Sequence, residues 1–359
     1  MNKSCTIGKK LIAPDAPVYI IAEMSGNHNG EFHRAMRIIE AAADAGADAV
    51  KLQTYTADTI TLDCNTPDFR IDYGSLWDGR TLHDLYREAA TPWEWQPRLA
   101  LRARELGMDC FSSPFDFSAV DFLEDMNVPA YKIASFEITD IPLLRKVAQT
   151  GKPVIISTGI AHREEIEEAV RTCRDAGNGQ IILLKCCSAY PAPYEDMNLR
   201  TIPKLAEDFG CLVGLSDHTP GHTVPVASVA LGACVVEKHL TLSRADGGVD
   251  SAFSMEPAEF KEMVTAIRDT EKSLGRATYD LSTKQEESRW LMRSLYIAQD
   301  LQPGDILTPE NLRSVRPGHG MHTRHYDEML GKKVNRVLRA GTPMAAEFVE
   351  DDLTPEADA

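Results

Sequence analysis

The chain has 359 residues, 43% of them hydrophobic, which is enough to bury a large core. Its 38 basic side chains are outnumbered by 54 acidic ones, and the net charge of -16 argues against a broad nucleic-acid surface, which needs clustered positive charge. No apolar run approaches the roughly 18 residues of a membrane span, and the N-terminus MNKSCTIGKKLIAPDA has no signal-peptide core. We therefore expect a soluble, cytoplasmic protein that binds neither nucleic acid nor membrane.

Eight short apolar strands are predicted, and nearly every one contains or ends in a charged or hydroxyl-bearing residue. They are VYIIAEM (18–24), AVKLQTY (49–55), CFSSPF (110–115), AYKIAS (130–135), PVIISTG (153–159), IILLKC (181–186), LVGLSDH (212–218) and CVVEKHL (234–240). Helices with apolar residues at three- and four-residue spacing are predicted at 33–46, 96–107, 118–126, 161–177 and 257–275. This alternation indicates a parallel sheet, and strands that are polar at one end indicate a closed (β/α)8 TIM barrel with its active site at the C-terminal mouth.

The longest interruption of this pattern lies between the second and third strands, from about Ala57 to Trp95. It carries three of the four tryptophans of the chain. An insertion at this position of a barrel follows the C-terminal end of a strand, so we expect it to cover a substrate at the mouth.

Past about Gly275 the pattern changes to short β-type runs broken by PGD, RPGHG and RAGT turns, with one short helical stretch near 326–330. These features indicate a compact, turn-rich module with a small core. We place a catalytic barrel domain at residues 1–280, a small domain at 290–350 and an acidic tail at 351–359.

Two histidines lie at the ends of the last two strands, His218 and His239. Neighbouring strands are about 4.8 Å apart, so the two imidazoles could share one divalent cation that keeps positions open for water and a substrate oxygen. By the two-residue period of a strand, Ser216 shares the face of His218, and Glu237 shares that of His239. The alternative is that both histidines simply hydrogen bond at strand ends.

Lysines among these strands suggest an anionic ligand, because a lysine inside a barrel is disfavoured unless it is paired. Lys51 and Gln53 point the same way, whereas Lys132 and Ser135 have opposite parity, so one of them must lie where its strand ends. The alternative is that the lysines pair with glutamates of the chain. The candidates are Glu23, Glu137 and Glu237. Hydroxyl groups that could complete a ring of donors around a phosphate belong to Ser113, Ser135, Ser157 and Ser216.

A series of motifs then spans almost the whole chain. They are AEMSGNHNG, AVKLQTY, FSSPFD, YKIASFEITD, ISTGIA, GLSDHT, VEKHLTL and SVRPGHG. In this order they resemble the sialic acid synthase family, and LWDGRTLHDLYREAATPWEW and KCCSAYPAP most resemble its pseudaminic acid synthases. The resemblance implies a (β/α)8 barrel followed by a small C-terminal antifreeze-like (SAF, β-clip) domain. It also implies a domain-swapped homodimer, in which the small domain of one chain covers the barrel of the other.

The resemblance further implies a reaction between phosphoenolpyruvate and the open-chain aldehyde of an amino sugar. The products are a nine-carbon 2-keto acid and phosphate, released with C–O cleavage. For the pseudaminic acid synthases the sugar is 2,4-diacetamido-2,4,6-trideoxy-β-L-altropyranose. The implied cofactor is a divalent cation, Mn, Mg or Co.

Matched motif by motif, the resemblance gives each candidate residue a role. The residues implied to bind phosphoenolpyruvate are Lys51, Ser113, Lys132, Ser135, Ser157, Ser188 and Ser216. Those implied to bind the metal are His218 and His239. Sugar binding falls to Glu23, Gln53, Tyr190, Asp250 and, from the partner subunit, Arg316. Glu137 lies between the substrates and is a catalytic candidate together with Glu23 and the two histidines. The chain departs from relatives that use N-acetylmannosamine at Ser188, where they have asparagine.

Other functions remain open from the sequence. The protein could make another nonulosonic acid, N-acetylneuraminate or legionaminate, from a different amino sugar. A metal-dependent aldolase or hydrolase on the same barrel would share His218 and His239 but release no phosphate from phosphoenolpyruvate. A non-catalytic carbohydrate-binding protein built on the small domain would leave the polar strand ends unexplained.

Overall fold

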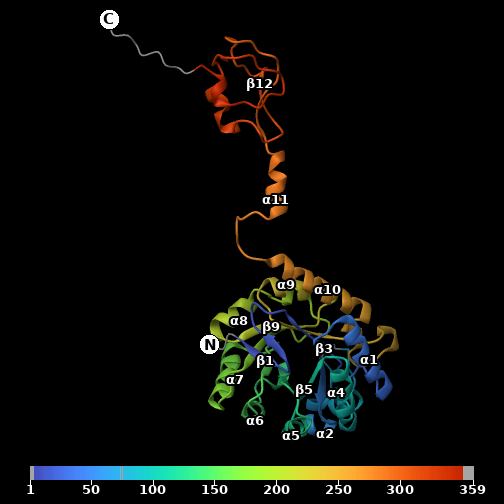
Figure 1. Cartoon of the computed structure of the whole chain (residues 1–359). Helices are drawn as coiled ribbons and strands as arrows, with labels where there is room; N and C mark the ends of the chain where they lie inside the picture. Colours follow the sequence, from blue (N-terminus) through green and yellow to red (C-terminus); the bar gives the residue numbers. More distant parts are fainter. Residues whose placement is uncertain (1–3, 73, 75, 351–359) are drawn as a thin grey trace. The chain divides into compact units, whose positions relative to one another are not determined.

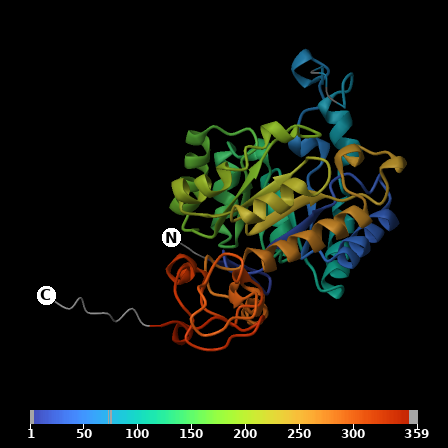
Figure 2. The ribbon, with the colours of Figure 1, turned by 90° about the horizontal axis from the view of Figure 1, so that it is seen from above.

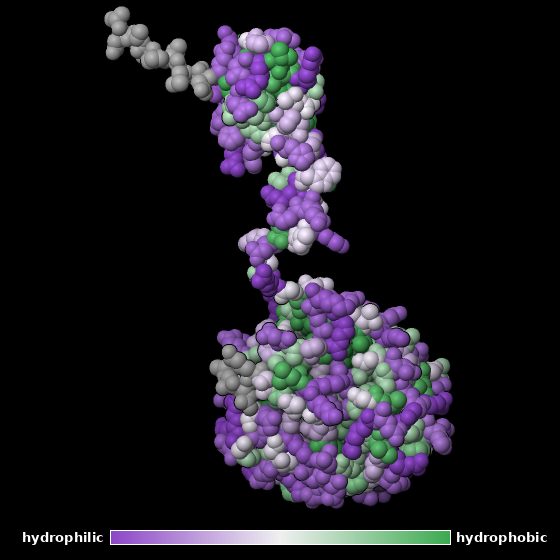
Figure 3. Space-filling model, in the orientation of Figure 1, coloured by the Kyte–Doolittle hydropathy of each residue, from purple (hydrophilic) through white to green (hydrophobic). Residues whose placement is uncertain are grey.

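A computed structural model describes residues 4–72, 74 and 76–350. The chain divides into two compact units, Met1–Gly275 and Arg276–Ala359. The predicted acidic tail, residues 351–359, lies outside the described residues. Among the helices of the described part, none is long and apolar enough to cross a membrane. On the face of the barrel unit shown in Figure 3, hydrophobic residues are scattered among hydrophilic ones.

In the described part of the first unit, parallel strands close into a barrel in the order β10-β3-β4-β5-β6-β7-β8-β9. The strands are β3 (Tyr19–Glu23), β4 (Ala49–Thr54), β5 (Asp109–Pro114), β6 (Tyr131–Ile133), β7 (Val154–Ser157), β8 (Ile181–Cys186), β9 (Leu212–Asp217) and β10 (Val235–His239). The register places Glu23 of β3 between Lys51 of β4 and His239 of β10. The predicted fold class is confirmed.

Helices surround the barrel strands (Figure 1). They are α1 (Phe32–Ala45), α4 (Gln96–Glu105), α5 (Phe117–Asp125), α6 (Ile141–Gln149), α7 (Arg163–Asp175), α8 (Thr201–Phe209), α9 (Thr223–Ala230) and α10 (Pro257–Leu274). The carboxylates of Asp116 and Asp140 accept hydrogen bonds from backbone N–H groups in the first turns of α5 and α6, which fixes where these helices begin. α1 ends at Gly46, whose φ of 88° is a left-handed conformation that favours glycine.

Three of these helices were not named from apolar spacing: α6, α8 and α9. Each has only eight or nine residues and carries a proline in its first turn, namely Pro142, Pro203 and Pro225. Proline is tolerated there because the first N–H groups of a helix have no intrahelical partner. A periodic pattern of about two turns with a proline inside it is too short for spacing alone to identify.

A β-hairpin that the sequence analysis did not foresee precedes the barrel, formed by β1 (Cys5–Ile7) and β2 (Lys10–Ile12). Ile7 and Ile12 are buried in one hydrophobic cluster with barrel residues such as Phe111. The turn at Gly8 lies against Asp109, the first residue of β5, so closely that a Cβ at Gly8 would lie 2.1 Å from its carboxylate oxygen. The hairpin therefore packs at the N-terminal ends of the strands.

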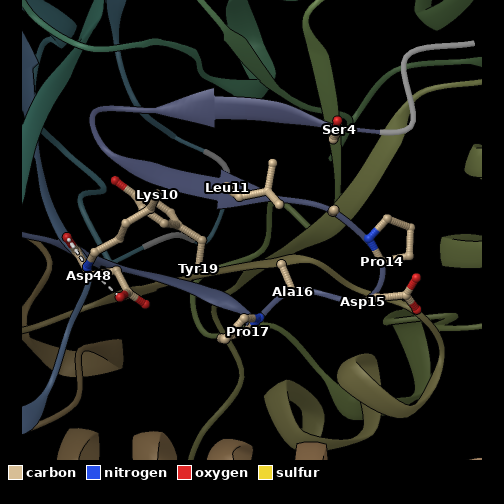
Figure 4. Close-up of a pocket in the computed structure, with 10 residues that line it drawn as sticks. Ser4, Lys10, Leu11, Pro14, Asp15, Ala16, Pro17, Tyr19 and Asp48 are labelled. Atoms are coloured by element: carbon tan, nitrogen blue, oxygen red, sulfur yellow. Dashed lines mark hydrogen bonds and ion pairs between the residues drawn. The ribbon is translucent and has the colours of Figure 1, made fainter.

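A cleft opens beside this hairpin, lined also by residues 13–17 and the start of β3 (Figure 4). Lys10 and Asp48 on its wall form an ion pair of 2.6 Å. Tyr19, the first residue of β3, also lines it. The cleft is thus at the opposite end of the barrel from the polar strand ends, and we do not assign it to the substrates.

The segment between β4 and α4 includes the short helices α2 (Ala57–Ile60) and α3 (Leu82–Ala89), and projects from the barrel unit (Figure 2). The indole N–H of Trp77 in this segment donates a hydrogen bond of 3.0 Å to the carbonyl of Val249, which follows β10. The Trp77 ring also lies 5.9 Å from that of Tyr190, which follows β8. The insertion therefore reaches the C-terminal mouth, as expected.

The second unit is rich in turns. Its α-helices and strands include α11 (Thr283–Glu287), the antiparallel strands β11 (Ser294–Ile297) and β12 (Leu312–Val315), and α12 (Tyr326–Met329) at the predicted helical stretch. Isolated bridges such as Leu301 to Leu338 add further antiparallel pairing. A small cluster of buried side chains that includes Leu295, Leu312 and Val334 forms its core.

Candidate active site

Four buried charged side chains meet at the C-terminal ends of the strands: Glu23, Lys51, Lys132 and Glu237. The ammonium of Lys51 forms a close ion pair with Glu23 and lies 3.2 Å from a carboxylate oxygen of Glu237. The ammonium of Lys132 lies 3.7 Å from the same oxygen. Of the three glutamates considered as partners of these lysines, Glu23 and Glu237 thus form ion pairs with them.

The pKa values of these groups are shifted unequally. Burial raises the pKa of Glu23 to about 7, in spite of the opposing effect of Lys51. Burial would also raise the pKa of Glu237, but Lys132 and Lys51 outweigh it and the pKa is lowered. Burial would lower the pKa of Lys51, but Glu23 and Glu237 raise it, whereas burial prevails and lowers the pKa of Lys132. At neutral pH Lys51 and Glu237 are therefore charged, and Glu23 titrates.

Two of the predicted serine hydroxyls contact these charges, and two others lie at the ends of neighbouring strands. Ser113 accepts a hydrogen bond of 3.4 Å from the Lys51 ammonium, and Ser216 donates one of 3.3 Å to Glu237. This contact places Ser216 and Glu237 on the same face of the barrel wall. Ser135, just after β6, accepts a hydrogen bond of 3.2 Å from the backbone N–H of Gly159. The hydroxyl of Ser157 is buried and has no hydrogen-bond partner among the described residues.

Gly159 allows two of the serines to approach each other. A Cβ at Gly159 would lie 2.1 Å from the hydroxyl oxygen of Ser188 and 2.7 Å from that of Ser135. The glycine therefore leaves the space in which these two hydroxyls stand.

His218 and His239 lie side by side, with their ring centroids 5.3 Å apart. Nδ1 of His218 is 3.0 Å from the carbonyl oxygen of Cys187, so Nδ1 carries the proton and Nε2 keeps a free lone pair. Burial would lower the pKa of His218, but Cys186 and the Cys187 carbonyl raise it. Burial lowers the pKa of His239, and the nearby imidazole of His218 and ammonium of Lys51 also disfavour its protonated form.

The donor set fits an open cation site. No group of three or more His, Cys, Asp or Glu side chains that could hold a metal ion occurs within residues 4–72, 74 and 76–350. Two imidazoles alone suit a cation whose remaining positions are filled by water and substrate oxygens. The Nδ1 atom of His239 is buried without a hydrogen-bond partner among the described residues, and a buried polar atom of this kind needs one.

Glu137 lies at the end of a 3₁₀ turn, η3 (Ser135–Glu137), that directly follows β6. One of its carboxylate oxygens is buried and, among the described residues, has no hydrogen-bond partner. Burial raises the pKa of this carboxyl to about 7. Glu137 can therefore exchange a proton near neutral pH.

Aromatic and acidic groups line the other side of the histidines. The ring of Tyr190 lies 4.5 Å from that of His218. Asp250 accepts a hydrogen bond from the hydroxyl of Ser25, and burial raises its pKa. Gln53, the second-last residue of β4, is half-buried.

Phe253 was missed in the sequence. It lies on the 3₁₀ turn η6 (Ser251–Phe253), is buried, and its ring is 5.0 Å from that of His239 and 5.1 Å from that of Tyr190. A lone phenylalanine in a loop after the last strand carries no polar signal that would distinguish it from core. Its position three residues after Asp250 was the only available hint.

Arg316 belongs to the second unit. It follows β12 on an exposed turn. Its predicted contact with the barrel of a partner subunit stays a prediction.

Two family models match this chain, one over each of its two parts. The model of the NeuB family matches residues 38–279, and that of the SAF domain matches residues 292–350. The family match covers more than half of the chain. The chain belongs to the NeuB family. The resemblance inferred from the sequence motifs is thereby confirmed.

Relatives of this NeuB-family chain include two pseudaminic acid synthases. That of Helicobacter pylori is 44% identical over 94% of this chain and 99% of its own length. That of Campylobacter jejuni is 46% identical over 91% of this chain and 95% of its own. Among solved structures, the N-acetylneuraminic acid synthetase of Leptospira borgpetersenii has a TM-score of 0.70 and 33% identity, covering 79% of this chain and 94% of that one.

Proposed function

We propose that this protein is a pseudaminic acid synthase. It condenses phosphoenolpyruvate with the open-chain aldehyde of 2,4-diacetamido-2,4,6-trideoxy-β-L-altropyranose, and consumes one water to give pseudaminic acid and phosphate. The observation that carries the proposal is the identity of 44% and 46% to two pseudaminic acid synthases over nearly the whole chain. The comparisons agree with the activity expected from the sequence motifs.

Phosphoenolpyruvate would bind at the lysine and serine side of the mouth. Lys51 and Lys132 supply positive charge for its phosphate and carboxylate, and both are buried, which strengthens a charged contact. Hydroxyls would complete the anion site. They belong to Ser113, Ser135, Ser157, Ser188 and Ser216. The unpartnered hydroxyl of Ser157 supports this assignment, because a buried donor without a partner is costly.

His218 and His239 would hold a divalent cation, Mn, Mg or Co. When bound, the cation polarises the sugar aldehyde and stabilises the negative charge that develops on its oxygen. The buried, unpartnered Nδ1 of His239 supports this role.

The amino sugar would lie on the side of Glu23, Gln53, Tyr190 and Asp250. The ring of Tyr190 lies next to that of His218, so a sugar held there would present its aldehyde to the histidine pair. Carbon C3 of phosphoenolpyruvate attacks this aldehyde, and C2 becomes a cationic centre that takes up water. The resulting tetrahedral centre releases phosphate with cleavage of its C–O bond.

Glu137 would act on the second half of the reaction. Its raised pKa lets it accept a proton from the attacking water, and its carboxylate can stabilise the positive charge at C2. Both roles need the ionised form. Glu23, whose pKa is also near neutral, is the second candidate for moving a proton.

A direct test offers the protein phosphoenolpyruvate with three sugars in parallel: the diacetamido-trideoxy-altrose, its 6-deoxy-mannose counterpart and N-acetylmannosamine. Phosphate release and product mass are measured for each. The proposal expects the altrose derivative to give the highest kcat/KM and a product of pseudaminic acid mass. A higher kcat/KM with either other sugar would refute it and favour a synthase of legionaminate or N-acetylneuraminate. Cleavage of a sugar acid without phosphate release would favour the aldolase.

We further propose that the protein acts in the cytoplasm as a domain-swapped homodimer, with a catalytic domain at residues 1–280 and a small domain at 290–350. Arg316 of one chain would then contact the sugar in the other. Its exposed guanidinium, on a turn outside the barrel, is available for such a contact and suits hydrogen bonding to acetamido or hydroxyl oxygens.

A further inference from the structure

A second buried ion pair lies next to the active site and is not used by the proposed chemistry. Lys238 on β10 and Asp217 on β9 are each 1% exposed, and the Lys238 ammonium donates a hydrogen bond of 2.5 Å to the Asp217 carboxylate. The two residues are direct partners in the ladder between β9 and β10. The pair therefore joins the two strands that carry His218 and His239.

This pair faces the outside of the barrel wall. Successive side chains of a strand point to opposite faces. Glu237, the neighbour of Lys238, contacts Ser216 and Lys51 inside the mouth. Lys238 and Asp217 consequently lie on the outer face of the barrel wall, away from the substrate side of the two histidines.

The pair also holds the backbone on both sides of His218. The Asp217 carboxylate accepts hydrogen bonds from the Thr219 backbone N–H at 3.1 Å and the Thr219 hydroxyl at 3.0 Å. The Lys238 ammonium donates a second bond of 2.5 Å to the Thr219 carbonyl. Asp217 and Thr219, the two residues that flank His218, are thus tied to the residue that precedes His239.

The position of this cluster indicates that it does more than fill space in the core. The ladder between β9 and β10 ends at the pair of Asp217 and Lys238, so both histidines lie beyond the last ladder pair between their strands. The His218 carbonyl accepts a backbone bond from Ala192 and the His239 carbonyl one from Met255, and His239 is also paired with Glu23 of β3, but none of these contacts joins β9 to β10. The Lys238 ammonium replaces the missing link between the strands with a bond to Thr219.

We propose that Lys238, Asp217 and Thr219 form a positioning cluster that sets the separation and orientation of His218 and His239, and so the affinity for their divalent cation. The proposal rests on the proposed function in that the two histidines hold the cation. A buried ion pair is weak evidence for stability, since apolar residues of the same volume often serve as well, but it can fix one geometry. The three are positioning residues, because they act through the histidines.

The test measures binding of Mn²⁺ alone to the full-length protein by titration calorimetry. Lys238→Met keeps the length of the side chain and removes its charge, and Asp217→Asn is a milder change that keeps a hydrogen-bond acceptor. Both should weaken Mn²⁺ binding by about 10- to 100-fold, as the loss of groups that orient metal ligands does. Saturating Mn²⁺ should restore much of kcat, while the KM for phosphoenolpyruvate changes by no more than about 3-fold.

Tyr19→Phe is the matched control. It removes a buried hydrogen bond of 2.7 Å from Tyr19 to Asp109 at the opposite end of the barrel, so it should lower Tm without changing Mn²⁺ affinity. A folded Lys238→Met or Asp217→Asn protein with native Mn²⁺ affinity would overturn the proposal. If Lys238→Met fails to fold, Asp217→Asn decides.

Failure of the proposed function has a different signature. If the native protein binds no Mn²⁺, the cation site is wrong, and crystal structures of the native protein and Asp217→Asn then decide the positioning claim. The two rings, 5.3 Å apart between centroids here, should separate or rotate in the variant. Unchanged rings would refute the positioning role.

Discussion

Gly159→Ala offers a sharp test of the anion site, because the new methyl group would occupy the space of two proposed ligand hydroxyls. Its Cβ would lie 2.1 Å from the Ser188 hydroxyl oxygen and 2.7 Å from that of Ser135. Both distances are far inside van der Waals contact, so each hydroxyl must rotate away. Rotation of a serine is cheap, and an added methyl at a compatible backbone reduces the entropy of the unfolded chain. The fold should therefore tolerate the change.

The expected cost appears in phosphoenolpyruvate binding. A hydrogen bond to a charged group contributes about 1.5 to 3 kcal/mol, so losing one such hydroxyl should raise the KM for phosphoenolpyruvate by about 10- to 150-fold. Steady-state phosphate release gives this KM, and thermal unfolding gives Tm. The KM for the sugar should change much less.

Gly214→Ala is the matched control. Its new methyl group would clash with a backbone atom, whereas that of Gly159→Ala would clash with side chains that can rotate. Its Cβ would lie 2.4 Å from the carbonyl oxygen of Val235 on the neighbouring strand. Neither the new Cβ nor the Val235 carbonyl can rotate away, so this variant should lose about 1 to 3 kcal/mol of stability by overpacking. If Gly159→Ala kept a native KM for phosphoenolpyruvate, or lost as much Tm as Gly214→Ala, the assignment of Ser135 and Ser188 to the anion would be wrong.

Four further predictions address the other parts of the site. Alanine at His218 or His239 should abolish turnover with the fold retained, and chelation should do so reversibly; full activity in exhaustive chelator would exclude the cation. Lys51→Met should raise the KM for phosphoenolpyruvate more than that for the sugar, and should lower the unfolding free energy by about 3 to 5 kcal/mol because Glu23 and Glu237 lose their buried cation. An effect on the sugar KM alone would reverse the two sides of the mouth. Burial raises the pKa of Glu137 to about 7, so its carboxylate forms as pH rises through that value, and kcat should rise with it. The Glu137→Gln protein should lack this rise in kcat. Identical pH profiles of kcat for the two proteins would show that Glu137 takes no part in the chemistry. Arg316→Ala and His218→Ala subunits, each inactive alone, should regain activity towards half the native value per heterodimer when mixed, and a nearly fully active Arg316→Ala protein would argue against the swapped contact.

The barrel and much of its mouth could be predicted because both depend on local patterns. Apolar runs with a polar end locate the strands. The two-residue period places Ser216 on the face of His218 and Glu237 on that of His239, but the contact between Ser216 and Glu237 depends on strand order and was not predicted. The two-residue period also predicted that either Lys132 or Ser135 lies where its strand ends, and Ser135 indeed lies beyond the end of β6.

Other features depend on contacts that no local pattern encodes. Nothing in CTIGKKLI says that Ile7 and Ile12 pack against the far ends of barrel strands. The buried pair of Lys238 and Asp217 was not predicted, because the two-residue period places both residues on the outer face of the barrel wall, away from the mouth. The ion pairs of Lys51 also depend on strand order. Closure of the barrel places β3 and β10, the first and last barrel strands in the sequence, next to each other, so both Glu23 and Glu237 lie near Lys51.

The barrel seam joins β3 to β10, where Tyr19 pairs with Val235 across about 200 residues of chain. Contacts between such distant segments carry a large loop-closure cost and tend to form late. On the ribosome, β3 and β4 emerge long before β10 exists, so Lys51 can meet Glu23 early, but Glu237 and His239 arrive only when the last strand docks. That step also covers the open strand edges of β3 and β9, which are sites of aggregation until then. The proposed cation ligands His218 and His239 therefore come together only in chains that have completed closure, and Mn²⁺ present during refolding should raise the yield of closed, monodisperse protein.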